Sequence, residues 1–266
     1  MSSRPPFFSI VTVCKNAEAS IERSIKSIID QPVRDFELII IDGVSDDATL
    51  DIISTYQKHI TYFVSEPDRG ISHALNKGID AASGEYILFV NADDWLHNNI
   101  LGKVRQFIRK YPGYDLYCGG SSFYNGKIHE VDSYSDWKNI GEETSIHHAS
   151  TVFKSSVFAK HGAFDETYSL AMDYELFLRF YQQKARFLNI PILVANRSLH
   201  GISYSNPVKS MKETRRARSK YFSPLNTWKT FYKSLFKDTI GRILKALPYF
   251  RNYYKKYWAK KNERIK

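Results

Sequence analysis

The chain has 266 residues and a formal net charge of +10, and its 43% of hydrophobic residues is enough for a buried core. Its two cysteines, Cys14 and Cys118, lie far apart and in no metal-ligand spacing, which argues against a disulfide scaffold and indicates a reducing compartment. The N-terminus lacks the apolar region and cleavage site of a signal peptide, and no apolar run reaches the ~18–20 residues of a membrane span.

Apolar runs and helical periods alternate through the N-terminal part of the chain. We expect strands at 7–13, 36–41, 60–64 and 86–90, with helices at 17–30, 47–58 and 71–82 between them. Strands that alternate with helices of this length predict crossover connections and a parallel sheet, so the expected fold class is α/β.

Polar residues follow each of these expected strands. The pairs Lys15-Asn16 and Asp42-Gly43 come after the first two, and Asp68 and Asn91 follow the third and fourth. Because ligands bind at the carboxyl ends of the strands in such sheets, these residues predict one shared binding site.

The fourth strand ends in Asn91-Ala92-Asp93-Asp94. Adjacent carboxylates at the exit of a buried strand cost free energy unless a cation lies near them. Mg²⁺ or Mn²⁺ holding a phosphate-bearing ligand would explain them, since both ions prefer oxygen ligands. The alternative is a turn that caps the next helix, a role that Asp and Asn also favour.

The pattern changes after residue 113. We expect a hairpin of 115–124 and 127–131 around Asn125-Gly126, helices near 155–161 and 171–183, and a closing strand at 187–195. Asp173 and Glu175 fall in the first turn of their helix, where the helix dipole alone favours carboxylates.

The positive charge belongs to the C-terminal part of the chain. Positions 209–266 contain 18 Lys and Arg against 3 Asp and Glu, whereas 1–208 contain 20 against 25. A boundary near Ser205-Asn206-Pro207 divides a globular domain at 1–205 from a basic, aromatic, helical tail at 206–266. The amphipathic pattern at 225–247 predicts that residues 225–266 bind an anionic membrane surface. The alternative is a helix that packs its apolar face on the globular domain.

Five stretches occur in an order that resembles a known family. They are SIVTVCKN (9–16), IIIDGVSDDAT (39–49), SEPDRGISHALNKGIDAASGEYILFVNADDWL (65–96), IHHASTVF (146–153) and GAFDETYSLAMDYELFLR (162–179). They resemble the inverting nucleotide-sugar glycosyltransferases of the family-two type, and are closest to bacterial enzymes that build exopolysaccharide, capsule or O-antigen. The resemblance implies a GT-A fold with a nucleotide-binding half at about 7–112 and an acceptor half at about 113–205.

The resemblance also assigns the donor site. It places Val13, Asn16, Asp42, Asp68 and Lys77 around a UDP- or GDP-sugar, with Asp42 at the nucleotide base and Lys77 near phosphate. The ordinary alternatives are a turn at Asp42-Gly43 and a helix end at Lys77.

Asn91-Ala92-Asp93 occupies the Asp-x-Asp position of the family. Asp93 would hold Mg²⁺ or Mn²⁺ at the diphosphate, and Asn91 replaces the usual first Asp, which reduces the charge of the metal site. Asp94 would hold the metal indirectly or bind the donor sugar. His200 matches a C-terminal histidine that reaches the metal in some relatives; the alternative is an ordinary loop histidine.

Asp173 falls at the position of the general base, which removes a proton from the acceptor hydroxyl. Met172 stands where the family usually has Glu, and Glu175 is the alternative base on the acceptor side. His147 and His148 match a histidine motif beside the acceptor; otherwise they are a partly buried polar pair.

The expected function is therefore sugar transfer to a glycan or polyprenyl-linked acceptor, in the cytoplasm and peripherally on the inner face of the cell membrane. A nucleotidyltransferase is an alternative, but it would need a Gly-rich basic loop where the chain has residues 13–17. Nucleic-acid binding through the basic tail is another, although no recognition motif accompanies the charge, and no nucleic-acid partner is expected.

Overall fold

The structure is a computed structural model that describes residues 5–199 and 206–246, with side chains through Phe236. Its strands are β1 (Phe8–Cys14), β2 (Phe36–Asp42), β3 (Tyr62–Ser65), β4 (Tyr86–Phe89), β5 (Trp95–Leu96), β6 (Leu116–Asn125), β7 (Ile128–Tyr134), β8 (Thr151–Lys154) and β9 (Phe187–Ser198). Its α-helices are α1 (Ile21–Ile29), α2 (Thr49–Thr55), α3 (Ile71–Ala81), α4 (Ile100–Lys110), α5 (Ser156–His161), α6 (Met172–Gln182), α8 (Pro207–Ser219) and α9 (Pro224–Ala246).

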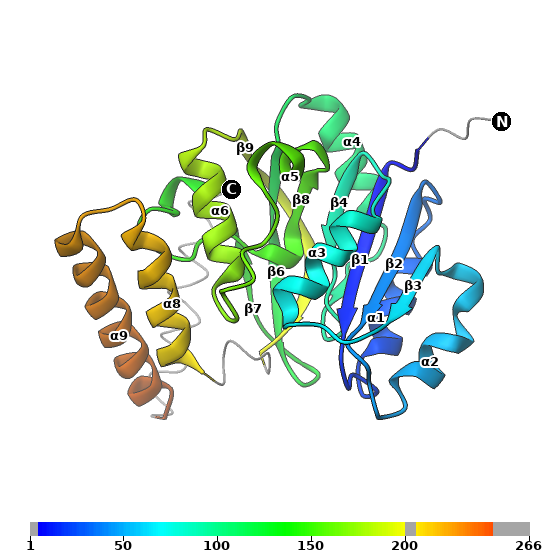
Figure 1. The fold of residues 1–266 in the computed structure, drawn as a ribbon, viewed down its shortest axis with the longest axis horizontal. Coiled ribbons are helices and arrows are strands. Elements are labelled where there is room, and N and C mark those ends of the chain that lie inside the picture. The colour runs from blue at the N-terminus through cyan, green and yellow to red at the C-terminus, as the bar shows by residue number, and fades with distance from the viewer. Residues whose placement is uncertain (1–4, 200–205, 247–266) are drawn as a thin grey trace.

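All nine strands form one sheet, in the order β3-β2-β1-β4-β8-β6-β9-β5, with β7 paired to β6 (Figure 1). The first four strands are mutually parallel, and Cys14 lies opposite Asp42, which lies opposite Ser65. In the other half, β6 and β9 run parallel, whereas β8, β7 and β5 pair antiparallel to their neighbours. The α/β fold class is confirmed, with a fully parallel N-terminal half and a mixed second half.

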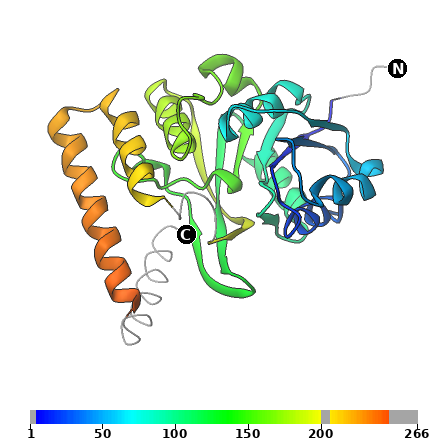
Figure 2. The ribbon, with the colours of Figure 1, turned by 60° about the horizontal axis from the view of Figure 1, so that its bottom comes forward.

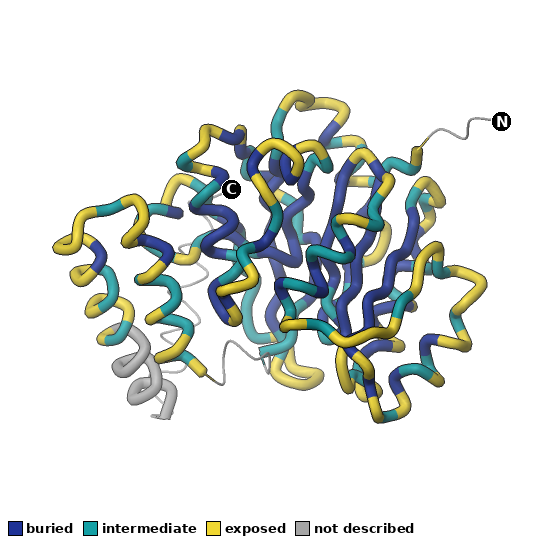
Figure 3. Tube along the Cα trace, in the orientation of Figure 1, coloured by how far each residue is buried: buried dark blue, intermediate teal, exposed yellow. Residues whose placement is uncertain are grey.

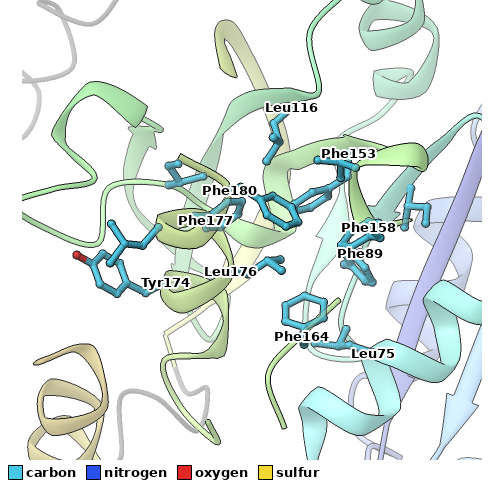
Figure 4. Close-up of a cluster of buried hydrophobic side chains, with 14 of the residues drawn as sticks. Leu75, Phe89, Leu116, Phe153, Phe158, Phe164, Tyr174, Leu176, Phe177 and Phe180 are labelled. Atoms are coloured by element: carbon cyan, nitrogen blue, oxygen red, sulfur yellow. The ribbon is translucent and has the colours of Figure 1, made fainter. Parts of the chain in front are cut away.

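Alternating side chains of the strands pack against helices on both faces of the sheet, as expected of buried strands. Val11 and Phe89 face a cluster covered by α3, α5 and α6, and Ile10 and Leu38 face one covered by α1, α2 and α4. Figure 3 shows the strands as the most buried part of the molecule. Figure 4 shows the first cluster, in which Phe153 stacks on Phe177 with ring centroids 5.6 Å apart.

The elements expected from the sequence are present with bounds that differ by a few residues. Helix α4 and strands β5 and β8 were not predicted, and α8 was predicted only as an unspecified part of the helical tail at 206–266. The signal for α4 was available, because Leu101, Val104 and Ile108 are buried at helical spacing. Helix α8 carries no comparable apolar stripe, since its two buried residues are Ala217 and Arg218.

Helix α8 packs against α6, and α9 packs against α8, at one end of the molecule (Figures 1 and 2). Ala217 belongs to the same buried cluster as Phe177 of α6. The expected division at residue 205 stays a prediction, but the first helix of the expected tail contributes to the core of the globular domain.

Candidate active site

The loops that follow β1, β2 and β4 lie at one edge of the sheet, toward which β1 and β2 point in Figure 1. Asn16 ties two of these loops together, since its backbone N–H donates to Ser45 Oγ (2.8 Å) and its Oδ1 accepts from the N–H of Asp46 (3.0 Å). Val13, expected in the donor site, is buried in the core beside this loop. The donor contacts of Val13 and Asn16 stay predictions.

Asp42 is fully buried at the end of β2, and four donors surround its carboxylate. Ser45 donates through its backbone N–H (3.0 Å) and hydroxyl (2.5 Å), Ser65 donates its hydroxyl (2.6 Å), and Cys14 its thiol (3.5 Å). Burial alone would raise the pKa of Asp42, but these hydrogen bonds outweigh it and hold the pKa below its usual value. The carboxylate is thus a fixed anion with its acceptor sites in use. To contact the nucleotide base of the donor, as expected, the Asp42 carboxylate would have to lose one of these four hydrogen bonds.

Asp68 approaches the backbone after β2. A Cβ at Gly43 would lie 2.5 Å from Asp68 Oδ2, so this approach requires glycine at position 43. The N–H of Gly70 donates to Asp68 Oδ1 (2.8 Å).

Val44, which follows Gly43, is exposed and has a φ of 61°. This conformation costs a β-branched residue about 1–3 kcal/mol. Sequence reasoning missed Val44, whose strain marks it as a candidate donor contact.

Lys77 holds the loop after β3. Its Nζ lies 2.8 Å from Glu66 Oε1 and donates to the carbonyl oxygen of Pro67 (3.0 Å). The phosphate contact expected for Lys77 stays a prediction, and this geometry does not favour it.

The segment after β4 forms a tight turn in which the N–H of Asp94 donates to the carbonyl oxygen of Asn91 (3.0 Å). Asp94 is 2% exposed, and this burial raises its pKa to about 7, against the opposing charge of Arg197. Asn91 Nδ2 donates to Asp94 Oδ2 (3.4 Å), and Arg23 donates to the carbonyl oxygen of Asp93 (3.3 Å). Ala92 packs in the core, so the turn holds its polar residues around a buried anchor.

Asn91 Oδ1 is buried and has no hydrogen-bond partner among the described residues. An orphaned oxygen in the same turn as Asp93 fits a hard divalent cation. No cluster of three or more His, Cys, Asp or Glu that could hold a metal occurs in residues 5–199 and 206–236. The chain would therefore supply one or two ligands and leave the others to phosphate and water, a common arrangement for Mg²⁺. His200, the third expected ligand, lies outside the described residues.

Asp173 is the second residue of α6, and its Oδ1 accepts from the N–H of Tyr174 (2.8 Å). Burial raises the pKa of Asp173, and both that hydrogen bond and the charge of Arg197 oppose the rise. A raised pKa strengthens a carboxylate as a proton acceptor, which suits the expected general base.

Glu175, the alternative general base, is fully buried and bonded to Arg179 (3.2 Å) and Lys220 (3.4 Å). Its acceptor-side role stays a prediction that this pairing does not favour.

Arg197 joins the two acidic segments, and sequence reasoning missed it. Trp95 pairs with Asn196 across β5 and β9, and this pairing brings Arg197 Nε to 3.8 Å from Asp94 Oδ1. The same positive charge opposes the rise that burial causes in the pKa of Asp173. Residues from distant parts of the sequence therefore share one cation. The only sequence signal was a single arginine just beyond the expected strand at 187–195.

His147 and His148 are uncharged at neutral pH. Burial, and secondarily Arg197, lowers the pKa of each to about 3. His148 stacks on Phe89 with ring centroids 4.8 Å apart, and His147 Nε2 lies 3.4 Å from Ser133 Oγ. His148 thus behaves as part of the aromatic core, and the acceptor-side role of both residues stays a prediction.

Comparisons with known proteins agree with this fold. A family model described as "Glycosyl transferase family 2" matches residues 9–195. A PGL/p-HBAD biosynthesis glycosyltransferase of Mycobacterium bovis (strain BCG / Pasteur 1173P2) is 28% identical over 203 residues, which cover 72% of this chain and 77% of the relative.

Two groups of solved structures share the fold. S. aureus TarS matches with a TM-score of 0.64 and 18% identity over 86% of this chain, which spans 42% of the TarS chain. A shorter TarS chain (1–349), in complex with UDP-GlcNAc, matches over 71% of its length with the same TM-score. The mannosyltransferase PcManGT from Pyrobaculum calidifontis, in complex with GDP-Man and Mn²⁺, has a TM-score of 0.64 and 16% identity over 98% of this chain and 88% of its own.

These likenesses show the fold, and the family model extends over most of the sheet and both acidic segments. The chain belongs to glycosyl transferase family 2 and is a glycosyltransferase with the GT-A fold.

Proposed function

We propose that this enzyme transfers a sugar from a UDP- or GDP-sugar to a hydroxyl of a glycan or polyprenyl-linked acceptor, with inversion, in the assembly of a bacterial surface polysaccharide or glycolipid. The observation that carries the proposal is Arg197, whose Nε lies 3.8 Å from Asp94 Oδ1 and whose positive charge also acts on the pKa of Asp173. This shared charge supports one reaction centre for the expected diphosphate end and the expected general base. The nucleotide sugars in the TarS and PcManGT complexes support a donor of this class.

The chemistry follows from the residues at that centre. Asp173 accepts the proton of the acceptor hydroxyl while the hydroxyl oxygen attacks the anomeric carbon of the donor sugar. The nucleoside diphosphate leaves from the opposite face. Asp93 and Asn91 would hold Mg²⁺ or Mn²⁺, which supplies positive charge to the leaving diphosphate. Arg197 keeps fixed positive charge beside Asp94 and thus limits the repulsion between this acidic turn and the diphosphate.

The test is a thermal-shift screen of UDP- and GDP-sugars with Mg²⁺ or Mn²⁺, followed by an assay for nucleotide release with acceptor. A donor at 100 times its Kd stabilises the folded state by about 2.7 kcal/mol. At roughly 2–4 °C per kcal/mol, the melting temperature should rise by roughly 5–10 °C. Asp93→Ala should lose the metal-dependent part of this shift. If no sugar nucleotide raises the melting temperature and none releases nucleotide, the proposal is wrong.

We further propose that α9 places the enzyme peripherally on the cytoplasmic face of the membrane. Four apolar residues at spacings of three and four remain exposed on it: Leu225 (82%), Trp228 (42%), Tyr232 (60%) and Phe236 (69%). Lys229 and Lys233 lie beside them and complement anionic lipid. None of the described helices is long and apolar enough to cross a bilayer.

Replacing Lys229 and Lys233 together with glutamate should weaken binding to phosphatidylglycerol vesicles at least about tenfold at low salt. Each lysine near an anionic surface contributes about 1 kcal/mol, and glutamate adds repulsion. The matched control is Lys58→Glu/Lys160→Glu, which changes the net charge equally at exposed positions away from α9. Vesicle cosedimentation measures both. Equal binding by the two double variants would exclude α9 as the lipid contact.

A further inference from the structure

The carboxylate of Glu213, on α8, lies at the start of α6, the helix that carries Asp173. Glu213 Oε2 accepts from three consecutive backbone N–H groups, those of Ser169 (3.1 Å), Leu170 (2.8 Å) and Ala171 (3.0 Å). Its Oε1 accepts from the hydroxyl of Ser169 (2.8 Å). Ala171 at the helix boundary provides no side-chain cap, and Glu213 accepts from its N–H and from those of the two residues before it.

This arrangement is electrostatically favourable. A negative charge near a helix N-terminus interacts with the positive end of the helix dipole, and hydrogen bonds to a carboxylate are stronger than those between neutral groups. Burial alone would raise the pKa of Glu213, but the backbone donors of Leu170, Ala171 and Ser169 outweigh it and lower the pKa. Glu213 is therefore charged at neutral pH.

Other residues of the same region hold the loop that leads into α6. Arg216 donates to the carbonyl oxygen of Thr167 (2.7 Å), and its guanidinium lies 3.7 Å from the ring centroid of Tyr168. Lys220, directly after α8, lies 3.3 Å from Asp165 Oδ2. Residues 165–171 are thus anchored to a segment that lies beyond the family match at 9–195.

We propose that Glu213 is a positioning residue for Asp173. It fixes the Ser169–Ala171 backbone, from which α6 starts, and so sets where the Asp173 carboxylate points two residues later. A displacement of about 1 Å at a reacting group can cost about 10²-fold in rate, so a contact that touches no substrate can still control turnover. The inference rests on the proposed role of Asp173 as the base.

The test compares Glu213→Ala, Glu213→Gln and the control Lys212→Ala, which removes an exposed side chain from the same helix. In Glu213→Ala we expect kcat to fall at least about tenfold while the donor KM stays within about twofold. Glutamine should recover most of kcat, because its amide oxygen can accept from the same N–H groups. Lys212→Ala should match the wild type. Amide hydrogen exchange over residues 165–175 should accelerate in Glu213→Ala alone.

The outcomes separate this inference from the proposed function. If the wild type transfers no sugar, the proposed function fails. If the wild type is active and Glu213→Ala keeps its kcat, the positioning role fails even where exchange accelerates. A parallel loss of kcat and donor binding would also overturn it, because that pattern indicates general unfolding. Should Glu213→Ala not fold, Arg216→Ala replaces it and should show the same kcat-selective loss.

Discussion

Replacing Asp173 with asparagine should reduce the transfer rate about 10³-fold while donor affinity changes less than about twofold, because a general base contributes about 10²–10⁴-fold. Asparagine has nearly the same shape and can still accept the hydrogen bond from Tyr174 through its amide oxygen. What it loses is the capacity to take the proton of the acceptor hydroxyl. Nucleotide release measures the rate, and titration with the donor nucleotide measures binding.

The pH profile gives this prediction a second readout. Burial raises the pKa of Asp173, and only the deprotonated carboxylate can act as base. Activity should therefore fall on the acidic side at a higher pH than an ordinary aspartate would give. Asparagine does not titrate, so this acidic limb should be absent from the residual activity of the variant.

The matched variant is Glu175→Gln, which changes the alternative base. Glu175 is fully buried and bonded to Arg179 and Lys220, so its replacement should lower stability rather than kcat. Full turnover by Asp173→Asn, or a selective loss of kcat in Glu175→Gln, would transfer the role of base to Glu175.

The parallel half of the sheet could be predicted because its information is local. Each strand is a short apolar run, and each helix has a 3.6-residue period. Polar residues follow each strand, and the parallel topology brings them to one edge of the sheet. The hydrogen-bond partners of those polar residues could not be predicted. Nothing in the residues next to Asp42 indicates that Ser65, from the next strand, closes its last acceptor position.

Arg197 and α8 show why the rest was missed. Asp94 and Arg197 meet only because β5 pairs with β9, and a strand of two residues leaves no periodic signal. Helix α8 is held to α6 largely by polar contacts, whereas hydrophobic periodicity detects only apolar faces. The boundary expected at residue 205 follows the change in charge, which carries no information about the polar contacts of α8.

The second large effect concerns Arg218 of α8. Its side chain is 2% exposed, donates to Tyr174 Oη (3.1 Å) and Asn226 Oδ1 (2.8 Å), and also donates to the carbonyl oxygen of Gly141. Arg218→Ala leaves the buried Tyr174 hydroxyl and the partly buried carbonyl of Gly141 without this donor and opens a cavity. The free energy of unfolding should therefore fall by about 3 kcal/mol, since hydrogen bonds to charged groups contribute about 1.5–3 kcal/mol each and are not additive.

Urea denaturation measures this loss, with a lower midpoint and an unchanged slope as the expected result. The control is Arg215→Ala, whose guanidinium lies 4.1 Å from the ring centroid of Trp228 on α9, so its loss should stay below about 1 kcal/mol. If residues 206–266 were a separate tail, both variants would leave the midpoint unchanged. If α8 is part of the packed domain, only Arg218→Ala lowers it substantially, because Arg218 bonds to Tyr174 of the helix that carries Asp173, whereas Arg215 lies against Trp228 of α9. Removing the segment proposed to bind lipid while keeping the enzyme folded then requires a chain that retains α8 and Asn226, which Arg218 contacts.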